Sequence, residues 1–322
     1  MLYELVIEVT GRHTAQGEER IPIALEEART GLQKAYDQGI RACAIVFIHG
    51  YRFTIHEKIV AEIAEEIGFT QVSASHEVSP LMKMVGRGDT TVVDAYLSPI
   101  LRRYVDQVAS ELGDTRLMFM QSNGGLTDAS LFHGRDCILS GPAGGVVGAV
   151  RTTAMGNFEK IICFDMGGTS TDVSHYAGNF ERAFESQVAG VRMRAPMMHI
   201  HTVAAGGGSI LHFDGARFTV GPDSAGANPG PTCYRRGGPL TVTDCNVMLN
   251  KLIPEFFPRV FGPNGDEPLD RSVVVEKFKC LANQITNTND ETMTPEEVAE
   301  GYLTIAVENM ANAIKKISIQ RG

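Results

Sequence analysis

The segment Cys163–His175, CFDMGGTSTDVSH, constrains the fold of this chain more than any other stretch. It follows the apolar, β-favouring run Lys160–Phe164 and leads into a second short run of the same kind. Two strands joined by a turn at Gly167 and Gly168 are therefore expected. Glycine would allow the backbone of this turn a positive φ and a close approach to a ligand. The segment predicts a hairpin whose turn presents backbone N–H groups.

The residues around this turn match the ligands of a phosphate and a metal ion. Asp165 and Asp172 are carboxylates that could hold Mg²⁺, directly or through water. Successive backbone N–H groups of such a turn bind anions. The alternative is a plain Gly-Gly hairpin, but that turn needs no aspartate on each side. The sequence therefore favours a phosphate loop, whose gripping residues would be Gly167, Gly168, Thr169, Ser170 and Thr171.

Two further glycine clusters lie before and after this segment. Gly206, Gly207 and Gly208 follow a short apolar run, which suggests close approach to a nucleotide or substrate, with a tight turn as the alternative. The stretch Leu139–Val150 carries glycines at an expected helix start. There they either receive phosphate or allow close packing of the helix, and the segment alone favours neither.

Two other segments leave alternatives open. His199 and His201 would share one face of a strand, which is compatible with a metal site, although ordinary hydrogen bonding is favoured because no third ligand is identifiable. The loop expected at Gly221–Gly238 is long for a compact domain. It is either a lid or substrate wall or a solvated linker, and its charged residues are Asp223, Arg235 and Arg236.

The composition excludes several classes of protein. A net charge of −9 and a pI near 5.5 argue against a nucleic-acid-binding protein, which would show a basic stripe. No apolar stretch approaches the length needed to cross a bilayer, so no membrane association is expected. The six cysteines form no CxxC pair, which favours free thiols in a reducing compartment. A cytoplasmic protein is the expectation.

The first 75 residues alternate between expected strands and helices. Strands are expected at Tyr3–Val9, Ala42–Ile48 and Gln71–Ser75, and helices at Ile23–Gln38 and Glu57–Ile67. This alternation is typical of an α/β fold.

The middle and end of the chain are expected to be more helical. Gly86–Gly113 predicts one long helix, or two broken near Pro99, that connects two lobes. Phe180–Val188 is expected to form a hairpin. A helix Cys245–Leu252 is expected with Asp244 as its N-cap. In the C-terminal third, Thr294–Glu297 predicts a capping box at the start of a long helix.

Seven stretches of this sequence, in this order, resemble the hydantoinase A/oxoprolinase family. They span almost the whole chain, and the last favours the branch that acts on 5-oxoproline over the N-methylhydantoinase and acetone carboxylase branches. The stretches are RGDTTVVDAYLSP, LMFMQSNGGL, ILSGPAGGVVGAV, FDMGGTSTDVSHYAG, HTVAAGGGSI, VGPDSAGANPGPTCYRRGGPLTVTD and FFPRVFGPNGDEPLD.

The resemblance implies a fold and a domain division. The fold would be the α/β actin-like ATPase of the acetate and sugar kinase type, with ATP between two ribonuclease-H-like lobes. Residues 1–112 would be the remainder of an incomplete first lobe plus the connecting helix. Residues 113–322 would be the second lobe, which carries the loop Asp165–Asp172 and ends in a helical segment.

The resemblance also implies a reaction, in which ATP cleavage drives the opening of the cyclic amide 5-oxo-L-proline to L-glutamate. ATP would phosphorylate the amide oxygen, and water would then open the activated ring. Asp165 and Asp172 would be the catalytic carboxylates, Asp165 would bind Mg²⁺, and Gly206–Gly208 would contact the nucleotide beside the phosphate loop.

A partner domain or subunit resembling hydantoinase B is implied as well, and a homo-oligomer is compatible with the resemblance. The alternatives are a subunit of an N-methylhydantoinase or acetone-type carboxylase, or a non-catalytic module that binds a partner. The chain on its own is expected to be nearly inactive.

Overall fold

The structure is a computed structural model that describes residues 2–188, 190–289 and 292–319. It divides into two compact units. The first unit comprises Met1–Gly148 and Phe180–His199, and the second comprises Ala149–Asn179 and Ile200–Gly322. The chain therefore leaves the first unit, returns to it once and leaves again. This division differs from the boundary expected at residue 112.

Helix α4 (Met84–Leu112) explains why later segments stay with the first unit. Asp94 is buried on this helix, and its Oδ1 accepts a hydrogen bond from the amide of Arg135 at 3.1 Å. The buried Thr90 accepts another from the amide of Arg194 at 2.9 Å. Of the two alternatives for this segment, the single helix is observed, because α4 continues through Pro99.

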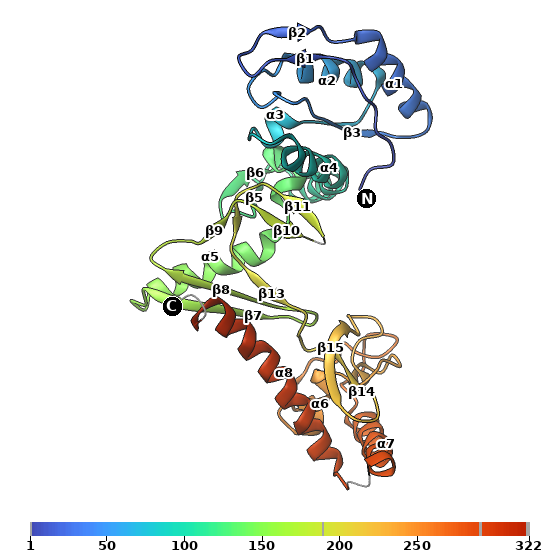
Figure 1. The fold of residues 1–322 in the computed structure, drawn as a ribbon. Coiled ribbons are helices and arrows are strands. Elements are labelled where there is room, and N and C mark those ends of the chain that lie inside the picture. The colour runs from blue at the N-terminus through green and yellow to red at the C-terminus, as the bar shows by residue number, and fades with distance from the viewer. Residues whose placement is uncertain (1, 189, 290–291, 320–322) are drawn as a thin grey trace. The chain divides into compact units, whose positions relative to one another are not determined.

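The first unit begins with a small α/β arrangement (Figure 1). Strands β3 (Ala42–Ile45) and β4 (Gln71–Ala74) pair in parallel and are connected by α2 (Ile55–Ile67). The expected α/β pattern is confirmed here, including α1 (Leu25–Asp37). The remaining elements of this region are β1 (Arg12–His13), β2 (Glu19–Ile21) and α3 (Ser75–Val78).

The strand expected at Tyr3–Val9 is wrong, since these residues form no ladder. Burial alternates only at the end of this segment: Ile7 and Val9 pack against the core of α1 and α2, while Tyr3, Leu5 and Val6 are exposed. Alternating burial alone does not make a strand, because a strand also needs a neighbouring backbone to bond.

Short strands complete the first unit. The hairpin expected at Phe180–Val188 is wrong, because β9 (Arg182–Ala183) pairs with β12 (Met197–Met198), and β10 (Ser186–Val188) pairs with β11 (Val191–Met193). Two more strands, β5 (Met118–Met120) and β6 (Leu126–Asp128), form a hairpin.

Helix α5 (Ser140–Ala154) contains the glycines of the stretch Leu139–Val150. A Cβ at Gly144 would lie 3.6 Å from the nearest side-chain atom, and one at Gly141 would meet nothing within 4 Å. These two glycines are therefore not required by close packing. Phosphate binding at this helix stays a prediction.

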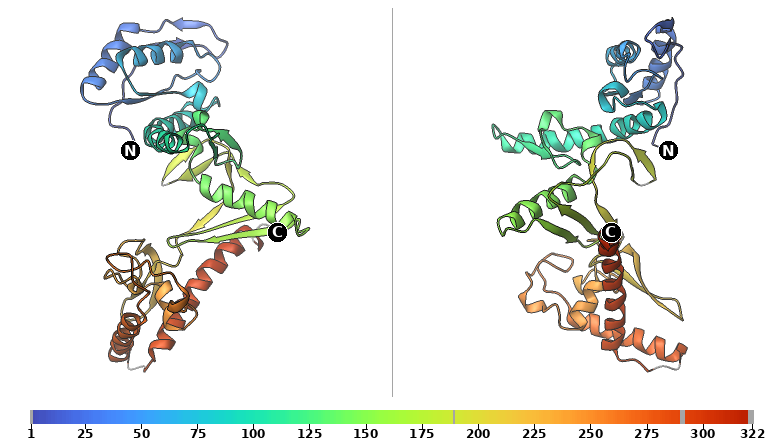
Figure 2. Two further views of the ribbon diagram at one scale, coloured as in Figure 1. Left: turned by 180° about the vertical axis from the view of Figure 1, so that it is seen from behind. Right: turned by 60° about the vertical axis from the view of Figure 1, so that its left-hand side comes forward.

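The second unit combines a three-stranded antiparallel sheet with a helical end. The sheet has the order β13-β8-β7, with β7 (Lys160–Met166), β8 (Thr171–Ala177) and β13 (His201–Val203). Helix α8 (Pro295–Ile317) lies against β8 and β13 (Figures 1 and 2). The buried Val173 of β8 packs on Ala313 and Ile317 of this helix, so one face of the sheet is covered.

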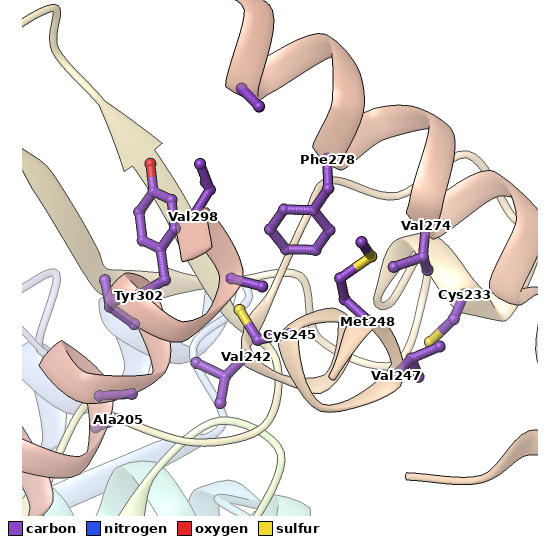
Figure 3. Close-up of a cluster of buried hydrophobic side chains, with 14 of the residues drawn as sticks. Ala205, Cys233, Val242, Cys245, Val247, Met248, Val274, Phe278, Val298 and Tyr302 are labelled. Atoms are coloured by element: carbon purple, nitrogen blue, oxygen red, sulfur yellow. The ribbon is translucent and has the colours of Figure 1, made fainter. Parts of the chain in front are cut away.

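The core of the second unit lies between its helices and a hairpin. Phe278 points from α7 (Arg271–Asn289) toward Cys245 and Met248 of α6 (Val242–Met248), as Figure 3 shows. Tyr302 of α8 donates a hydrogen bond to the carbonyl of His212 at 3.0 Å. The hairpin consists of β14 (Ser209–Phe213) and β15 (Phe218–Ser224). The expected helical C-terminal part and the capping box of Thr294 and Glu297 are confirmed.

The N-cap expected for the helix that follows residue 240 is wrong by three positions. Thr241 is the N-cap of α6, and Asp244 is its third residue, completing a capping box. Asp244 is fully buried, and it accepts hydrogen bonds from the amides of Thr232 and Cys233 at 3.0 and 2.8 Å. Burial raises the pKa of Asp244, and these hydrogen bonds oppose that rise.

The expectation of free cysteines is confirmed, whereas the expected location in the cytoplasm is not tested. All six cysteines are free thiols, as expected, with Cys233 and Cys245 buried, and burial raises the pKa of the Cys43 thiol to about 12. Within residues 2–188, 190–289 and 292–319, no helix is both long and apolar enough to cross a bilayer. The cytoplasmic location stays a prediction.

Candidate phosphate-binding site

The predicted hairpin is present, and its register brings the two aspartates together. In the pairing of β7 with β8, Asp165 lies directly opposite Asp172. Directly opposed residues of an antiparallel pair have their side chains on the same face, with Cβ atoms about 4.5–5.5 Å apart. Two like charges in this position destabilise a sheet unless something neutralises them. Among the residues that the structure describes, neither aspartate forms an ion pair with a basic side chain.

A third residue extends this row across the sheet. Thr202 of β13 lies opposite Asp172 and donates a hydrogen bond from Oγ1 to its Oδ1 at 2.5 Å. Asp172 is thereby held in one orientation, while Asp165, on the edge strand, is exposed. The face of this row is opposite to that of Val173, which α8 covers. Carboxylate and hydroxyl oxygens are donors that suit Mg²⁺, so the row fits this ion.

The turn between the strands is closed by a hydrogen bond from the amide of Gly167 to the carbonyl of Ser170 at 2.9 Å. Gly168 and Thr169 are exposed, and in the described part of the chain their amides donate to no protein acceptor. A Cβ at Gly168 would meet nothing within 4 Å. The tip of the turn therefore has two amides and free space in front of them, as an anion requires.

Two details of the predicted loop are wrong. Gly167 and Gly168 do not adopt a positive φ, so the turn does not need glycine for its backbone conformation. The hydroxyl of Thr171 is buried and donates to the carbonyl of Ala205 at 2.6 Å, so it holds the loop in place instead of facing a ligand.

The second glycine cluster packs directly under this turn. The amide of Gly207 donates to the carbonyl of Gly167 at 3.1 Å, and that of Gly208 donates to the carbonyl of Gly168 at 2.6 Å. These two amides are consequently used within the protein. The geometry gives the cluster a supporting role, and direct contact of Gly206–Gly208 with a nucleotide stays a prediction.

Close backbone contact explains two of these glycines. A Cβ at Gly206 would lie 2.7 Å from the carbonyl oxygen of Gly167, and one at Gly208 would lie 2.8 Å from that of Gly168. Side chains at these positions would separate the two segments. The neighbouring Gly207 is held from the other side, because its carbonyl accepts from both the amide and the hydroxyl of Thr243 at 2.8 Å.

Sequence reasoning missed Thr202 and Thr243 as parts of this site. Thr202 follows the expected pair of histidines, and nothing in its sequence neighbourhood marks it as a partner of Asp172. The shared strand face expected for His199 and His201 is not formed, because β13 begins at His201 and leaves His199 outside the strand.

The charged residues of Gly221–Gly238 are engaged within the second unit. Arg235 forms ion pairs with Asp270 at 3.0 Å and Glu267 at 3.3 Å, which favours a packed loop over a solvated linker. Asp223 accepts a hydrogen bond from His212 at 2.8 Å, which lowers the pKa of that carboxyl. The role of this loop as a substrate wall stays a prediction.

Two family models match this chain and together identify its family. The family model described as Hydantoinase/oxoprolinase matches residues 87–322. The chain belongs to the hydantoinase/oxoprolinase family. The model of the Hydantoinase/oxoprolinase N-terminal region matches residues 1–68, so both parts of the family pattern are represented.

Most of the chain aligns with relatives named as 5-oxoprolinases. A 5-oxoprolinase of Saccharomyces cerevisiae is 48% identical over 91% of this chain, which corresponds to 23% of that protein. The chain thus spans about a quarter of the length of this relative.

Two solved structures have the same architecture as this chain. A nucleotide-free acetone carboxylase structure matches with a TM-score of 0.80 and 25% identity, over 98% of this chain and 45% of that one. The ATP-dependent caprolactamase of Pseudomonas jessenii matches with a TM-score of 0.75 and 31% identity, over 98% and 46%. The mixed α/β architecture is confirmed, whereas the assignment to actin-like, ribonuclease-H-like lobes stays a prediction.

Proposed function

We propose that this chain is the phosphate-binding part of an ATP-dependent cyclic-amide hydrolase that opens 5-oxo-L-proline to L-glutamate. The single observation that carries the proposal is the exposed turn after β7, where free amides lie next to two opposed carboxylates. The 48% identity to a 5-oxoprolinase supports the choice of substrate. The 25% identity to acetone carboxylase makes a carboxylase the weaker alternative.

In this proposal each part of the site has one task in phosphoryl transfer. Transfer of the γ-phosphoryl group of ATP to the amide oxygen makes the ring carbon electrophilic, and two waters then complete ring opening and release of phosphate. The exposed amides of Gly168 and Thr169 hold phosphate oxygens where negative charge is concentrated. Asp165 would hold Mg²⁺, whose charge would offset that of the phosphates, and Asp172 is fixed beside Asp165 by Thr202. A hydantoinase B-like partner would supply the remaining parts of the substrate site.

The substrate is tested with the full-length protein and any partner subunit. We expect 5-oxoproline to give glutamate and ADP in equal amounts, with no carboxylated product from acetone and bicarbonate and no opening of caprolactam. The last two substrates test the activities named for the structural relatives. Acetoacetate formation without glutamate would contradict the oxoprolinase assignment and leave the nucleotide site standing.

The chain alone provides a simpler measurement. We expect it to bind Mg·ATP and Mg·ADP weakly in a calorimetric titration and to release no glutamate from 5-oxoproline. Rapid turnover of 5-oxoproline by these 322 residues would contradict this expectation.

Gly168→Ala and Gly206→Ala form a matched pair that separates binding from support. Gly168→Ala places a methyl group in free space, so we expect unchanged stability and at least about tenfold weaker Mg·ATP binding, because the methyl group occupies space beside the exposed amides and keeps a phosphate oxygen from one of them. Gly206→Ala places its methyl group against backbone, so we expect a loss of about 1–3 kcal/mol of stability. Thermal unfolding and calorimetry measure the two effects. Equal effects of both variants on stability would refute the distinction.

A further inference from the structure

Three histidines and a glutamate gather in the first unit, far along the sequence from the phosphate loop. His13 of β1 and Glu19 of β2 are partners in the register of this short antiparallel pair, so their side chains share a face. His56 is the second residue of α2, and it is 1% exposed. Neither the reaction proposed above nor the family resemblance uses His13, Glu19 or His56.

The distances between these side chains match a set of metal ligands. His56 Nε2 lies 2.8 Å from Glu19 Oε1, and the rings of His13 and His56 have centroids 4.2 Å apart. One ligand atom from each of the three residues lies within 4.8 Å of the other two. A tetrahedral ion with bonds of about 2.0–2.2 Å needs ligand atoms about 3.4 Å apart. The half-exposed Glu19 side chain can rotate away from His56 to open their 2.8 Å separation toward this spacing.

A second observation points to the same place. His49 Nδ1 is buried, and it has no hydrogen-bond partner in the part of the chain that the structure describes. His49, His13 and His56 line one small cavity of about 10 Å³. Burying a polar nitrogen without a partner is costly, and an ion or its bound water in this cavity would provide one.

The hydrogen bond between His56 and Glu19 satisfies only part of this cluster. It gives one imidazole nitrogen a partner, but it accounts neither for the second imidazole, which lies beside it at an interplanar angle of 50°, nor for the unpaired nitrogen of His49. Imidazole and carboxylate together suit Zn²⁺ and similar transition metals, whereas Mg²⁺ prefers oxygen donors alone. The chemistry is therefore different from that of the aspartate row.

We propose that His13, Glu19 and His56 bind one divalent transition-metal ion of the Zn²⁺ type, with His49 on the wall of the same cavity. The ion joins the β1–β2 pair to the start of α2. Strands β1 and β2 have only two and three residues. A bound metal ion would therefore stabilise this pair more than its own backbone hydrogen bonds do.

The test uses the 322-residue chain, stripped of metal by a chelator and titrated with ZnCl₂ in a calorimeter. We expect one Zn²⁺ per chain and a rise in the unfolding temperature on binding. Titration with Co²⁺ should produce the intense visible absorption of a tetrahedral site. Glu19→Gln and His13→Gln should each weaken Zn²⁺ binding at least about tenfold.

Asp223→Asn is the matched control. His212 and Asp223 form another histidine–carboxylate pair at 2.8 Å, but they belong to no group of three potential ligands among the described residues. This variant should leave Zn²⁺ affinity unchanged. Glu19 and Asp223 are both about half exposed, so neither substitution should prevent folding, which far-UV circular dichroism checks. Absence of stoichiometric binding, or weak multiple binding that Glu19→Gln and His13→Gln leave unchanged, would overturn the proposal.

Discussion

Asp165→Asn in the full-length enzyme is expected to lower the rate of ATP cleavage by about 10³-fold. The substitution keeps the size of the side chain and removes the charge through which we propose it binds Mg²⁺. Loss of one preorganised charge-stabilising group typically costs about 10²–10³ in rate, and a metal ligand belongs at the upper end because the ion also orients the phosphates. Steady-state release of phosphate at saturating 5-oxoproline measures the effect, and excess Mg²⁺ should restore part of the rate.

The same variant distinguishes a functional aspartate from a structural one. Asp165 is exposed and faces Asp172 directly, so removal of its charge relieves repulsion between the strands. We therefore expect an unfolding temperature that is unchanged or slightly higher. Asp266→Asn, at an exposed position of the same unit, is the control and should alter neither activity nor stability. A destabilised Asp165→Asn with normal ATP cleavage would show that this carboxylate serves the fold alone.

The local parts of this site could be predicted from sequence, whereas its long-range contacts could not. Apolar runs on both sides of Gly167 and Gly168 indicated the hairpin, and the pattern of the runs placed both aspartates beside the turn. The carbonyls of these glycines accept from Gly207 and Gly208, about forty positions later. Loop-to-loop contact of this kind depends on how the whole sheet and its helices pack, which no local pattern encodes.

The errors at the strands have a related cause. Alternation at Tyr3–Val9 suggested a strand, but only Ile7 and Val9 pack against the core, and pairing depends on whether another backbone lies alongside. For the same reason Thr202 could not be recognised, because its role depends on the register of β13 against β8. The two-residue strand β1 has too little sequence of its own to carry a pattern.

Asp244 shows how a misplaced cap can conceal a larger role. Its Oδ2 accepts from the amide and the hydroxyl of Thr241, both at 2.9 Å, and from the amide of Thr232. Its Oδ1 accepts from the amide of Cys233. One buried carboxylate therefore holds the segment that follows β15 against the start of α6, and α6 in turn holds Gly207 through Thr243.

Asp244→Ala is expected to destabilise the second unit by about 3–5 kcal/mol, because it leaves three buried donors without an acceptor: the amide of Cys233 and the amide and hydroxyl of Thr241. Thermal unfolding measures the loss, and faster hydrogen exchange at the amides of Cys233 and Thr241 locates it. Asp214→Ala is the control: Asp214 also accepts from two amides, at 2.9 and 2.8 Å, but its carboxylate is exposed. Its loss should stay below about 1 kcal/mol, since water replaces the acceptor.

The conservative variant Asp244→Asn tests the same role of the carboxylate if Asp244→Ala fails to fold. Asparagine retains one acceptor oxygen and turns an NH₂ group toward the remaining donors, so it should lose stability and expose the same two amides to exchange. Because α6 supports the glycine cluster under the phosphate loop, both variants should also weaken Mg·ATP binding, whereas Asp214→Ala should not. Equal losses of stability in Asp244→Ala and Asp214→Ala would mean that the buried carboxylate is not the anchor of the segment that follows β15.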